Sequence, residues 1–259
     1  MASNAAVFKR RLRIVEMVNR AGIMSVEDLS RALDVSPITV RRDLDHLAAE
    51  GSIMRRHGSA VSITFDSDGA TEKSLSEKDV LNIEEKMRIA AKAASMVADG
   101  EILFMNSGST TLCFLKALKG RRVKVITNNA AAIGIEHSPE VELMILGGEY
   151  REQSQSLVGE FALNAIRTIY SDHTFLGTNG LSLEKGLTTS VYQECSINQA
   201  MIEHTHGKVI VLADSSKMGK VANFVSASLD KVDMVITDSN CTNEYRQRLE
   251  AIGITVVIA

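Results

Sequence analysis

The apolar positions of the first 50 residues recur every three to four residues, a period that predicts amphipathic helices. The first predicted helix spans residues 6–20 and ends at Gly22. Its apolar side consists of Phe8, Leu12, Val15 and Val18. The second helix starts at Ser25, whose hydroxyl can accept a free backbone amide while Asp28 reaches back towards it.

A third predicted helix has two distinct faces. It starts at Ser36, a favourable N-cap, continues with Pro37 in its first turn, and ends before Gly51. At 100° per residue, one face is formed by Val40, Leu44 and Leu47. The opposite face is formed by Ile38, Arg42 and His46, with Thr39 beside them and Arg41 on the flank. The first face suits a core, and the second presents a cation and hydrogen-bonding groups.

A short hairpin with two arginines at its base is predicted directly after this helix, over residues 52–63. Three helices and a basic hairpin form the plan of a winged helix-turn-helix domain. In that plan the third helix enters the DNA major groove, where an arginine can bind guanine through two hydrogen bonds. We expect Arg42, helped by Thr39 and Ile38, to contact bases, and the other arginines to contact phosphates. The candidate DNA contacts are Ser36, Ile38, Thr39, Arg41, Arg42, His46, Arg55, Arg56 and His57.

Two alternatives to DNA binding remain open at this point. Arg41 and Arg42 could only solvate a helix face, although the cap, the core spacing and the basic hairpin together favour a DNA contact. The winged helix could also contact protein. Asp43 is assigned to structure, because it points towards the neighbouring helices, where Lys9 or Arg10 can pair with it, and because it would repel phosphate.

The motifs of this region carry a family resemblance. They are R-x-x-I-V-x-x-V from Arg11, V-x-x-L-S-x-x-L-x-V-S-x-x-T-V-R-R-D-L-x-x-L-x-x-x-G from Val26, and R-x-H-G from Arg55. Here the chain resembles the DNA-binding domain of the DeoR family of bacterial sugar-metabolism repressors. Ser59 departs from the pattern, because the family usually has a second glycine in the wing turn, and a turn with positive φ there tolerates serine less easily.

The rest of the chain predicts a connector and a larger domain. Residues 64–81 are polar and aperiodic, so we expect an exposed connector. A helix follows from a capping-box-like Asn82 and Glu85. Its inward positions are expected to be Met87, Ala91, Ala94 and Val97. The expected organisation is a winged helix-turn-helix domain over 1–63, a linker over 64–81 and a larger domain over 82–259.

Short apolar runs alternate with helical patterns through the larger domain. They cover residues 101–105, 123–127, 141–146, 173–177, 208–213, 232–237 and 254–258. Nearly continuous apolar strands between helices predict an α/β fold with a mostly parallel, Rossmann-like sheet covered on both faces. Ligands of such sheets bind at the carboxyl ends of the strands.

Small and hydrogen-bonding residues follow five of these strands. The first set, 106–111, opens a helix, whose N-terminal amides and hydroxyls suit a phosphate, although Ser/Thr clusters are also common caps. The others are 127–129, 147–149, 177–180 and 214–217. Lys217 adds a cation, whereas Gly147 and Gly148 could equally make a tight turn.

This second half also resembles the DeoR family. The motifs are S-G-S-T-T, V-I-T-N, L-G-G, F-L-G-T-N-G-L, G-L-T-T and L-A-D-S-S-K-M-G. They resemble the family's effector domain, which is similar in fold to ribose-5-phosphate isomerase, and the resemblance implies a phosphorylated sugar as effector. The candidate effector-binding residues are Asn106, Ser107, Gly108, Ser109, Thr110, Thr111, Thr127, Asn128, Asn129, Gly147, Gly148, Gly177, Asn179 and Lys217.

Asn106 stands where many family members have aspartate in D-x-G-[ST]-T. An amide removes a negative charge that would repel a second anionic group, and it adds donors. We therefore hypothesise an effector with an acidic or ketonic group besides its phosphate, such as a sugar-acid phosphate.

Charge and composition agree with a DNA-binding regulator. Residues 1–61 hold ten Lys/Arg and seven Asp/Glu, so that they carry +3 within a chain of net charge −3. The three cysteines lack metal or disulfide spacing, and no apolar run approaches the roughly 18 residues of a membrane span, so we expect the cytoplasm. One module makes too few DNA contacts for discrimination, which predicts a homodimer or homotetramer.

An enzymatic function is the main alternative. Isomerisation requires a base and a group that stabilises an enediolate. The isomerase fold carries acids in a D-x-A-D-E stretch, which corresponds here to 172–177 with apolar or small residues at the later acidic positions. Asp214 and Lys217 are interpreted as a ligand clamp, and His204 and His206 as solvated residues that face different sides. We therefore expect a repressor modulated by a phosphorylated sugar, without a metal or cofactor, and keep an isomerase-like enzyme as the alternative.

Overall fold

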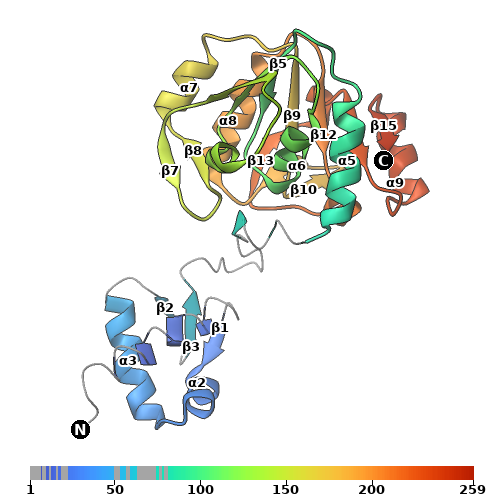
Figure 1. Cartoon of the computed structure of the whole chain (residues 1–259). Helices are drawn as coiled ribbons and strands as arrows, with labels where there is room; N and C mark the ends of the chain where they lie inside the picture. The colour runs from blue at the N-terminus through green and yellow to red at the C-terminus, as the bar shows by residue number, and fades with distance from the viewer. Residues whose placement is uncertain are drawn as a thin grey trace. The chain divides into compact units, whose positions relative to one another are not determined.

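The chain forms two compact units, Met1–Glu72 and Lys73–Ala259, and the boundary falls inside the predicted connector (Figure 1). Each unit has its own hydrophobic core. The computed structural model describes residues 7, 10–11, 13–15, 17–18, 23–49, 53–56, 59–62, 74–75, 78 and 81–259.

The smaller unit combines helices with a three-stranded antiparallel sheet. The described residues between 7 and 18 are helical. They are followed by β1 (Ile23–Ser25), α2 (Val26–Leu33), α3 (Pro37–Ala49), β2 (Ile53–Arg56) and β3 (Ser59–Ser62). The strand order is β1-β3-β2. The predicted helices and hairpin are therefore present, and the architecture is that of a winged helix-turn-helix.

The core of the smaller unit confirms most of the predicted apolar faces. Its buried residues are Ile14, Val18, Val26, Leu29, Val40, Leu44, Leu47, Ile53 and Ala60. Ser25 caps α2 as predicted, since its hydroxyl accepts the Asp28 amide at 3.0 Å and donates to the Asp28 carboxylate at 2.7 Å. In the first helix Val18 is buried and Val15 packs against the core as predicted, whereas the fully buried Ile14 was not predicted. Phe8 and Leu12 lie outside the described residues.

Strand β1 was not predicted. Its three residues pair with β3, Ile23 with Val61 and Ser25 with Ser59. Three residues carry no measurable alternation, so only the distant partner strand defines them. Ser59 also pairs with Arg56 across the hairpin, so it lies in strand β3 and not in the turn. A strand position accommodates a serine easily.

The larger unit is built on a seven-stranded parallel sheet, and all seven predicted strands take part. They are β4 (Ile102–Met105), β5 (Val123–Thr127), β6 (Val141–Ile145), β9 (His173–Gly177), β12 (Val209–Leu212), β14 (Met234–Thr237) and β15 (Thr255–Ile258). The strand order is β15-β14-β12-β9-β4-β5-β6, and every neighbouring pair is parallel. The carboxyl ends of these strands therefore meet at one edge of the sheet.

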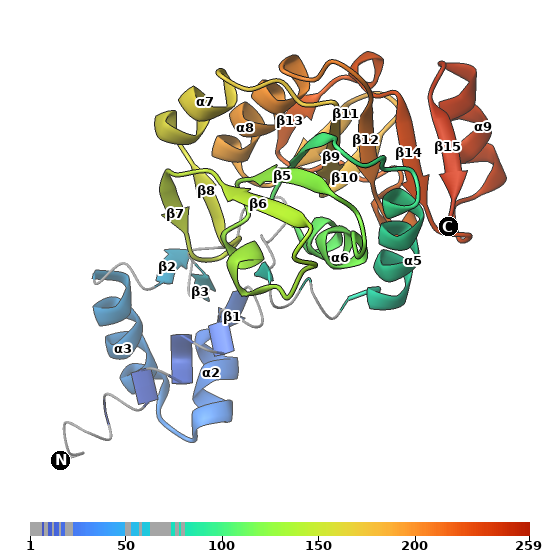
Figure 2. The same ribbon diagram turned by 45° about the horizontal axis from the view of Figure 1, so that its top comes forward.

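Helices cover both faces of this sheet (Figures 1 and 2). One core contains side chains of α5 (Ile83–Ala94) and α6 (Ser109–Ala117), and the other contains side chains of α7 (Glu160–Ile166), α8 (Tyr192–Glu203) and α9 (Asn243–Ala251). Within β4, Leu103 and Met105 belong to the first core and Phe104 to the second. This alternation follows from the two-residue period of a strand.

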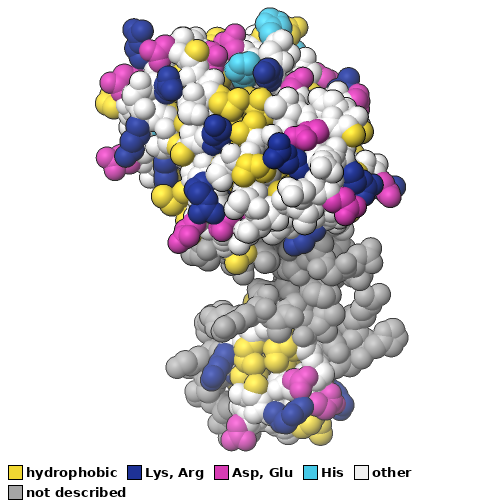
Figure 3. Space-filling model, turned by 90° about the vertical axis from the view of Figure 1, so that its right-hand side faces the viewer, with side chains coloured by type: hydrophobic (Ala, Val, Ile, Leu, Met, Phe, Trp, Pro, Cys, Tyr) yellow, Lys and Arg dark blue, Asp and Glu magenta, His cyan; other side chains and the backbone are white. Residues whose placement is uncertain are grey.

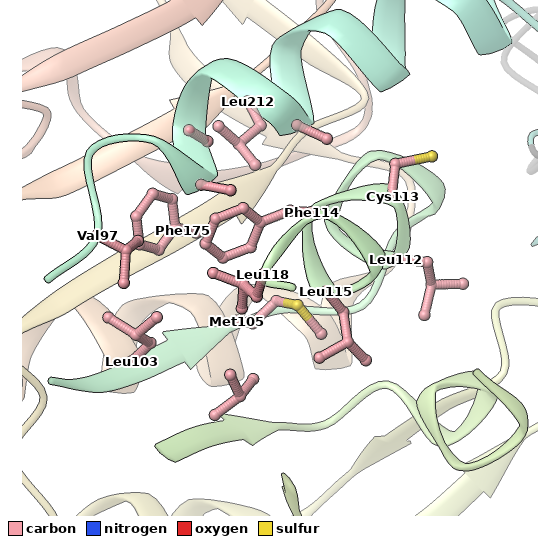
Figure 4. Packing of buried hydrophobic residues seen from close by; sticks show 14 of the residues in the cluster. Val97, Leu103, Met105, Leu112, Cys113, Phe114, Leu115, Leu118, Phe175 and Leu212 are labelled. Atoms are coloured by element: carbon pink, nitrogen blue, oxygen red, sulfur yellow. The ribbon is translucent and has the colours of Figure 1, made fainter. Parts of the chain in front are cut away.

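Figure 4 shows part of the first core, with side chains of α6, β4 and β9 packed together. Phe114 of α6 stacks on Phe175 of β9 with ring centroids 4.2 Å apart. Both rings are fully buried, so they fix α6 against the middle of the sheet. The start of α6 is thereby held at the carboxyl ends of β4 and β9.

Helix α5 faces the core differently from the prediction. Met87 is 59% exposed and Ala91 is also exposed, whereas Ala94 and Val97 are buried as expected. The buried stripe runs through Lys86, Ile89, Ala90, Ala93 and Ala94. Lys86 can occupy an inward position of this stripe because its ammonium donates to the Lys78 carbonyl.

Asn82 does not cap α5 with its side chain, contrary to the prediction. Its amide instead donates to Asp214 Oδ1 at 3.0 Å and to Ser216 Oγ at 3.3 Å. The preceding segment is also less exposed than predicted, since Leu75 is buried in the larger unit and its amide donates to the Gln153 carbonyl at 2.9 Å. Tertiary contacts thus hold the described part of the connector.

Smaller elements complete the larger unit. They are η1 (Ala130–Gly134), β7 (Glu149–Arg151), β8 (Ser156–Val158), β10 (Gly180–Ser182), β11 (Gly186–Thr189), η2 (Ser215–Lys217), β13 (Phe224–Ala227) and η3 (Leu229–Lys231). β7 and β8 form a hairpin, and β10, β11 and β13 form a second sheet. Among the described residues, no helix has the length and apolarity needed to cross a bilayer.

Candidate functional site

Helix α3 presents the outward face that the sequence predicted. Its core side is fixed by Val40, Leu44 and Leu47, which are all buried. On the other side Ile38 is 63% exposed, and Arg41, Arg42 and His46 are exposed as well. The exposed face of α3 thus combines an apolar side chain with two cations, which are the groups that contact a thymine methyl and a guanine edge in DNA-binding helices.

The start of α3 is fixed by local hydrogen bonds. The Ser36 hydroxyl accepts the Thr39 amide at 3.3 Å and lies 2.9 Å from the Thr39 hydroxyl. Both residues are therefore engaged in the cap, which leaves their DNA contacts a prediction.

Asp43 joins the first helix to α3. Its carboxylate is buried and pairs with Arg10 Nε at 2.6 Å and with Arg11 Nε at 2.9 Å. The structural role of Asp43 and its pairing with Arg10 follow the prediction; the second arginine, Arg11, was not anticipated. Arg10 and Arg11 are therefore engaged within the unit. Arg41 and Arg42 of α3, in contrast, are exposed to solvent.

The basic hairpin can be placed only by its backbone. Arg55 pairs with Ala60 and Arg56 with Ser59 in the β2–β3 ladder. The side chains of Arg55 and Arg56, and all of His57, lie outside the described residues.

In the larger unit, Figure 3 shows Lys/Arg and Asp/Glu side chains intermixed over one face, which does not favour binding of a polyanion to that face.

The candidate effector site lies at the carboxyl ends of β4, β5, β9 and β12. Asn106, directly after β4, is buried and ties two of these ends together. Its amide donates to the Gly177 carbonyl and to Asn198 Oδ1, each at 3.0 Å, and its Oδ1 accepts the Gly177 amide at 2.8 Å. Asn106 and Gly177 are thus brought together as the strand order requires, and the Asn106 side chain holds the strands with both of its polar ends.

The loop Ser107–Thr111 is fixed by its neighbours. Thr111 donates from its hydroxyl to the carbonyls of Asn106 and Gly108, each at 2.9 Å. The Asn129 amide donates to the Gly108 carbonyl at 3.2 Å. The β4 and β5 ends are therefore joined, and the N-terminus of α6 faces this edge of the sheet with its free amides.

The residues after β5 form a compact turn. The Thr127 hydroxyl oxygen accepts the backbone N–H of Asn129 at 3.0 Å. Asn129 Oδ1 accepts the backbone N–H of Ala131 at 3.2 Å and thereby caps η1. Asn128 donates to the Leu157 carbonyl at 3.1 Å, while its buried Oδ1 has no protein partner. A buried acceptor without a partner marks Asn128 as able to take a ligand donor.

The paired glycines have different roles. A Cβ at Gly148 would lie 2.4 Å from the Val158 carbonyl oxygen, so Gly148 is required by the close approach of β7 and β8. A Cβ at Gly147 would meet nothing within 4 Å. Gly148 is therefore required by its contact with Val158, whereas Gly147 has space for a side chain, and effector contacts of both glycines stay a prediction.

Two carboxylates, Asp214 and Asp238, accept backbone amides of the segment after β12. Asp214 Oδ1 accepts the Ser216 amide at 3.0 Å, and Asp238 accepts the amides of Ser215 at 2.6 Å and Asn240 at 2.9 Å. Burial alone would raise the pKa of Asp238, but these backbone amides donate to it, and the pKa lies below its ordinary value. Lys217 is the last residue of η2, which follows β12. In the sheet, β12 is the neighbour of β9, whose carboxyl end belongs to the candidate site.

Besides Asn198, four residues at the site were not anticipated. The central one is Glu194, in the first turn of α8, whose side chain is 12% exposed. Its Oε1 accepts the Ser156 hydroxyl at 3.1 Å and the Ser107 hydroxyl at 3.4 Å. Its Oε2 accepts the Thr189 hydroxyl at 3.2 Å, and Arg151 lies 4.0 Å away. The predicted residues Ser107 and Asn179 meet here, since Thr189 also donates to Asn179 Oδ1 at 3.2 Å.

The two histidines at the end of α8 both contact one aromatic ring. The ring of Tyr170 has its centroid 5.0 Å from that of His204 and 4.5 Å from that of His206. The α8 helix ends at Glu203, so the three following residues are free of helical periodicity. The described residues contain no cluster of three His, Cys, Asp or Glu side chains that could hold a metal.

Comparisons with known proteins agree with the geometry. The DeoR-like helix-turn-helix domain matches residues 10–65, and the DeoR C terminal sensor domain matches residues 81–239. The HTH-type transcriptional regulator GlpR of Haloferax volcanii is 36% identical over 250 residues, covering 96% of this chain and 96% of that protein. The lactose phosphotransferase system repressor of Lactococcus lactis subsp. lactis is 33% identical, covering 92% of this chain and 93% of that protein.

Similarity to enzymes is much weaker. A ribose 5-phosphate isomerase A structure from Methanocaldococcus jannaschii matches with a TM-score of 0.39 and 19% identity, over 53% of this chain and 55% of that chain. A likeness of this size carries no functional argument, whereas the relatives above are transcriptional regulators and match over almost their whole length. The chain belongs to the DeoR family of DNA-binding transcriptional regulators, with an N-terminal helix-turn-helix domain and a C-terminal sensor domain.

Proposed function

We propose that this regulator represses a carbohydrate-utilisation operon, and that a phosphorylated sugar or sugar acid bound in its sensor domain controls operator binding. The observation that carries the proposal is the convergence of loops from β4, β5 and β9 on one edge of the parallel sheet. Backbone amides of α6, several hydroxyls and Arg151 meet there, as a phosphate requires.

The remaining ligand contacts distinguish a sugar from a bare phosphate. Asn128 offers its unpartnered Oδ1 to a sugar hydroxyl. The backbone of Gly147 has open space where a side chain would lie. Because both Asn106 ends are already engaged, its contribution is to hold the site without adding a negative charge. The Asn106 position itself therefore adds no charge that would repel an effector with an acidic group besides its phosphate.

DNA recognition is assigned to α3. Arg42, with Ile38 and Thr39 beside it, is proposed to contact bases, while Arg41, Arg55 and Arg56 contact phosphates. A single helix-turn-helix gives limited discrimination, so the protein is proposed to act in the cytoplasm as a homodimer or homotetramer on repeated half-sites.

Footprinting and titration of DNA from upstream of its own gene test this function. Arg42→Ala should cost about 1–3 kcal/mol on the operator and relax its sequence preference, whereas Arg56→Ala should weaken all sequences alike and lower the salt slope by about 1. Arg88→Ala, on an exposed helix of the sensor domain, serves as the control. A panel of neutral and acidic sugar phosphates should include one that changes operator affinity. Binding that ignores every effector, or identical losses on specific and random DNA, would refute the assignment.

A further inference from the structure

Glu194 places a negative charge where the proposed function needs an anion to bind. Its side chain is mostly buried at the start of α8. Three hydroxyl groups from three segments donate to it: Ser107 after β4, Ser156 of β8 and Thr189 of β11. A carboxylate that gathers donors from three segments is bound as an anionic ligand would be.

Two of the groups around Glu194 also belong to the candidate phosphate site. Ser107 opens the loop whose amides face the edge of the sheet. Arg151, 4.0 Å from Glu194, is the cation that the β7–β8 hairpin brings to the same place. A serine hydroxyl has one proton to donate, so Ser107 cannot donate to Glu194 and to a phosphate together.

The bonds that hold Glu194 are exchangeable. The Arg151 contact is at the outer limit of an ion pair, and the Ser107 contact at 3.4 Å is long. The hydroxyl donors can rotate towards another acceptor at small cost, because each has one freely turning O–H bond. Nothing in this geometry locks the carboxylate in place as close ion pairs would.

We propose that Glu194 is the internal occupant of the anion site, and that an effector phosphate must displace it to reach the Ser107 hydroxyl and Arg151. The inference rests on the proposed function of the site. Displacement has a cost, since two negative charges about 4 Å apart repel even at an effective dielectric constant near 20. Inorganic phosphate has only its charge to meet this cost, whereas a sugar phosphate adds the contacts of the sugar. Glu194 thereby makes the sensor selective for phosphorylated sugars over free phosphate.

Displacement also changes the contacts of other segments. The Thr189 hydroxyl lies 3.2 Å from both Glu194 Oε2 and Asn179 Oδ1 and can donate its one proton to either, and Ser156 lies 2.8 Å from Ser154 in the β7–β8 hairpin. Removal of the carboxylate therefore takes one contact from the start of α8 and one from the hairpin. This links occupancy of the site to a change in the segments around it.

The test is titration of the full-length protein with inorganic phosphate by calorimetry. Glu194→Gln keeps the size of the side chain and removes its charge, so phosphate should bind on the order of tenfold more tightly than to the wild type. Adding Ser107→Ala to this variant should abolish most of the gain. Glu203→Gln, an exposed charge at the other end of α8, should bind phosphate as the wild type does. Glu194→Ala is the second neutral variant if glutamine perturbs folding.

The outcomes separate this inference from the proposed function. Unchanged or weaker phosphate binding in the folded neutral variants overturns the inference. Loss of sugar-phosphate binding without a gain for inorganic phosphate also overturns it, and shows Glu194 to be a direct contact to the sugar. A gain for phosphate in Glu194→Gln supports the inference even if the wild type responds to no sugar phosphate, which would refute only the proposed effector class. A wild-type response to a sugar phosphate with no gain in the variants leaves the function and removes the inference.

Discussion

Each of the two units contains a carboxylate with little exposure to solvent, Asp43 in the smaller and Glu194 in the larger, and the partners of the two carboxylates are different. Asp43 of the smaller unit pairs with two arginines at 2.6 and 2.9 Å. Glu194 of the larger unit is held by three neutral hydroxyls and by one arginine at 4.0 Å. The same chemical group therefore lies in a closed ionic cluster in one unit and in an exchangeable setting in the other.

The difference teaches how to distinguish a structural carboxylate from a functional one. Close charged partners neutralise Asp43, and their loss would leave its buried carboxylate without a counterion. Hydroxyls, in contrast, remain satisfied by any acceptor, including water or a ligand oxygen. The buried carboxylate of Asp238 lies between the two cases, because its donors are fixed backbone amides of Ser215 and Asn240. The comparison predicts that the stability cost of neutralisation falls from Asp43 to Asp238 to Glu194.

The largest effect is expected for Asp43→Asn. The substitution leaves Arg10 and Arg11 without a counterion between the first helix and α3, and removing one partner of a buried ion pair costs about 3–5 kcal/mol. Urea unfolding followed by circular dichroism should show the smaller unit destabilised, with operator binding lost in parallel. Glu27→Gln, an exposed acid on α2, is the control and should change stability by less than about 0.5 kcal/mol. Equal stability of the two variants would remove Asp43 from the structural class.

A smaller effect is expected for Asp238→Asn. The new amide group turns one donor towards a backbone N–H, which costs about 2 kcal/mol. The pKa of Asp238 is lowered in the folded state, so its ionised form stabilises the fold above the ordinary value of about 4, and the contribution is lost as the pH falls through the folded-state pKa. The stability difference between wild type and variant should therefore be full at pH 7 and should shrink below about pH 4. A difference that stays constant with pH would contradict this assignment.

Local sequence patterns were sufficient for the elements that local physics determines. The outward face of α3 followed from the helical period around Val40, Leu44 and Leu47. All seven strands of the parallel sheet followed from continuous apolar runs, because strands covered on both faces have no polar side. The edge of the sheet that carries the candidate site followed from the same pattern.

The errors arose where a distant partner decides. Asn82 forms its bonds with Asp214 and Ser216, more than 130 positions away, instead of capping its own helix. On α5 the buried stripe contains Lys86, whose ammonium donates to the Lys78 carbonyl, eight positions earlier and before the helix begins. The periodicity of one helix does not show either of these contacts.

The hub of the site was missed for a related reason. Glu194 follows the G-L-T-T motif by five residues, but a lone glutamate in a helix start normally reads as a favourable first-turn charge. Its partners Ser107, Ser156 and Thr189 come from segments 87, 38 and 5 positions away. Only the folded sheet brings them to one carboxylate.

The smallest effect is expected for Glu194→Gln, and it sharpens the comparison most. The amide oxygen can still accept from a hydroxyl, the amide nitrogen can donate to a rotated one, and no close ion pair is broken, so stability should change by less than about 1 kcal/mol. Urea unfolding at pH 7, without ligand, measures this beside Asp43→Asn and Asp238→Asn. A loss as large as that of Asp43→Asn would place Glu194 among the structural carboxylates and would leave an anion no reason to displace it. A small loss instead shows that the carboxylate is held loosely enough for a phosphate to take its donors.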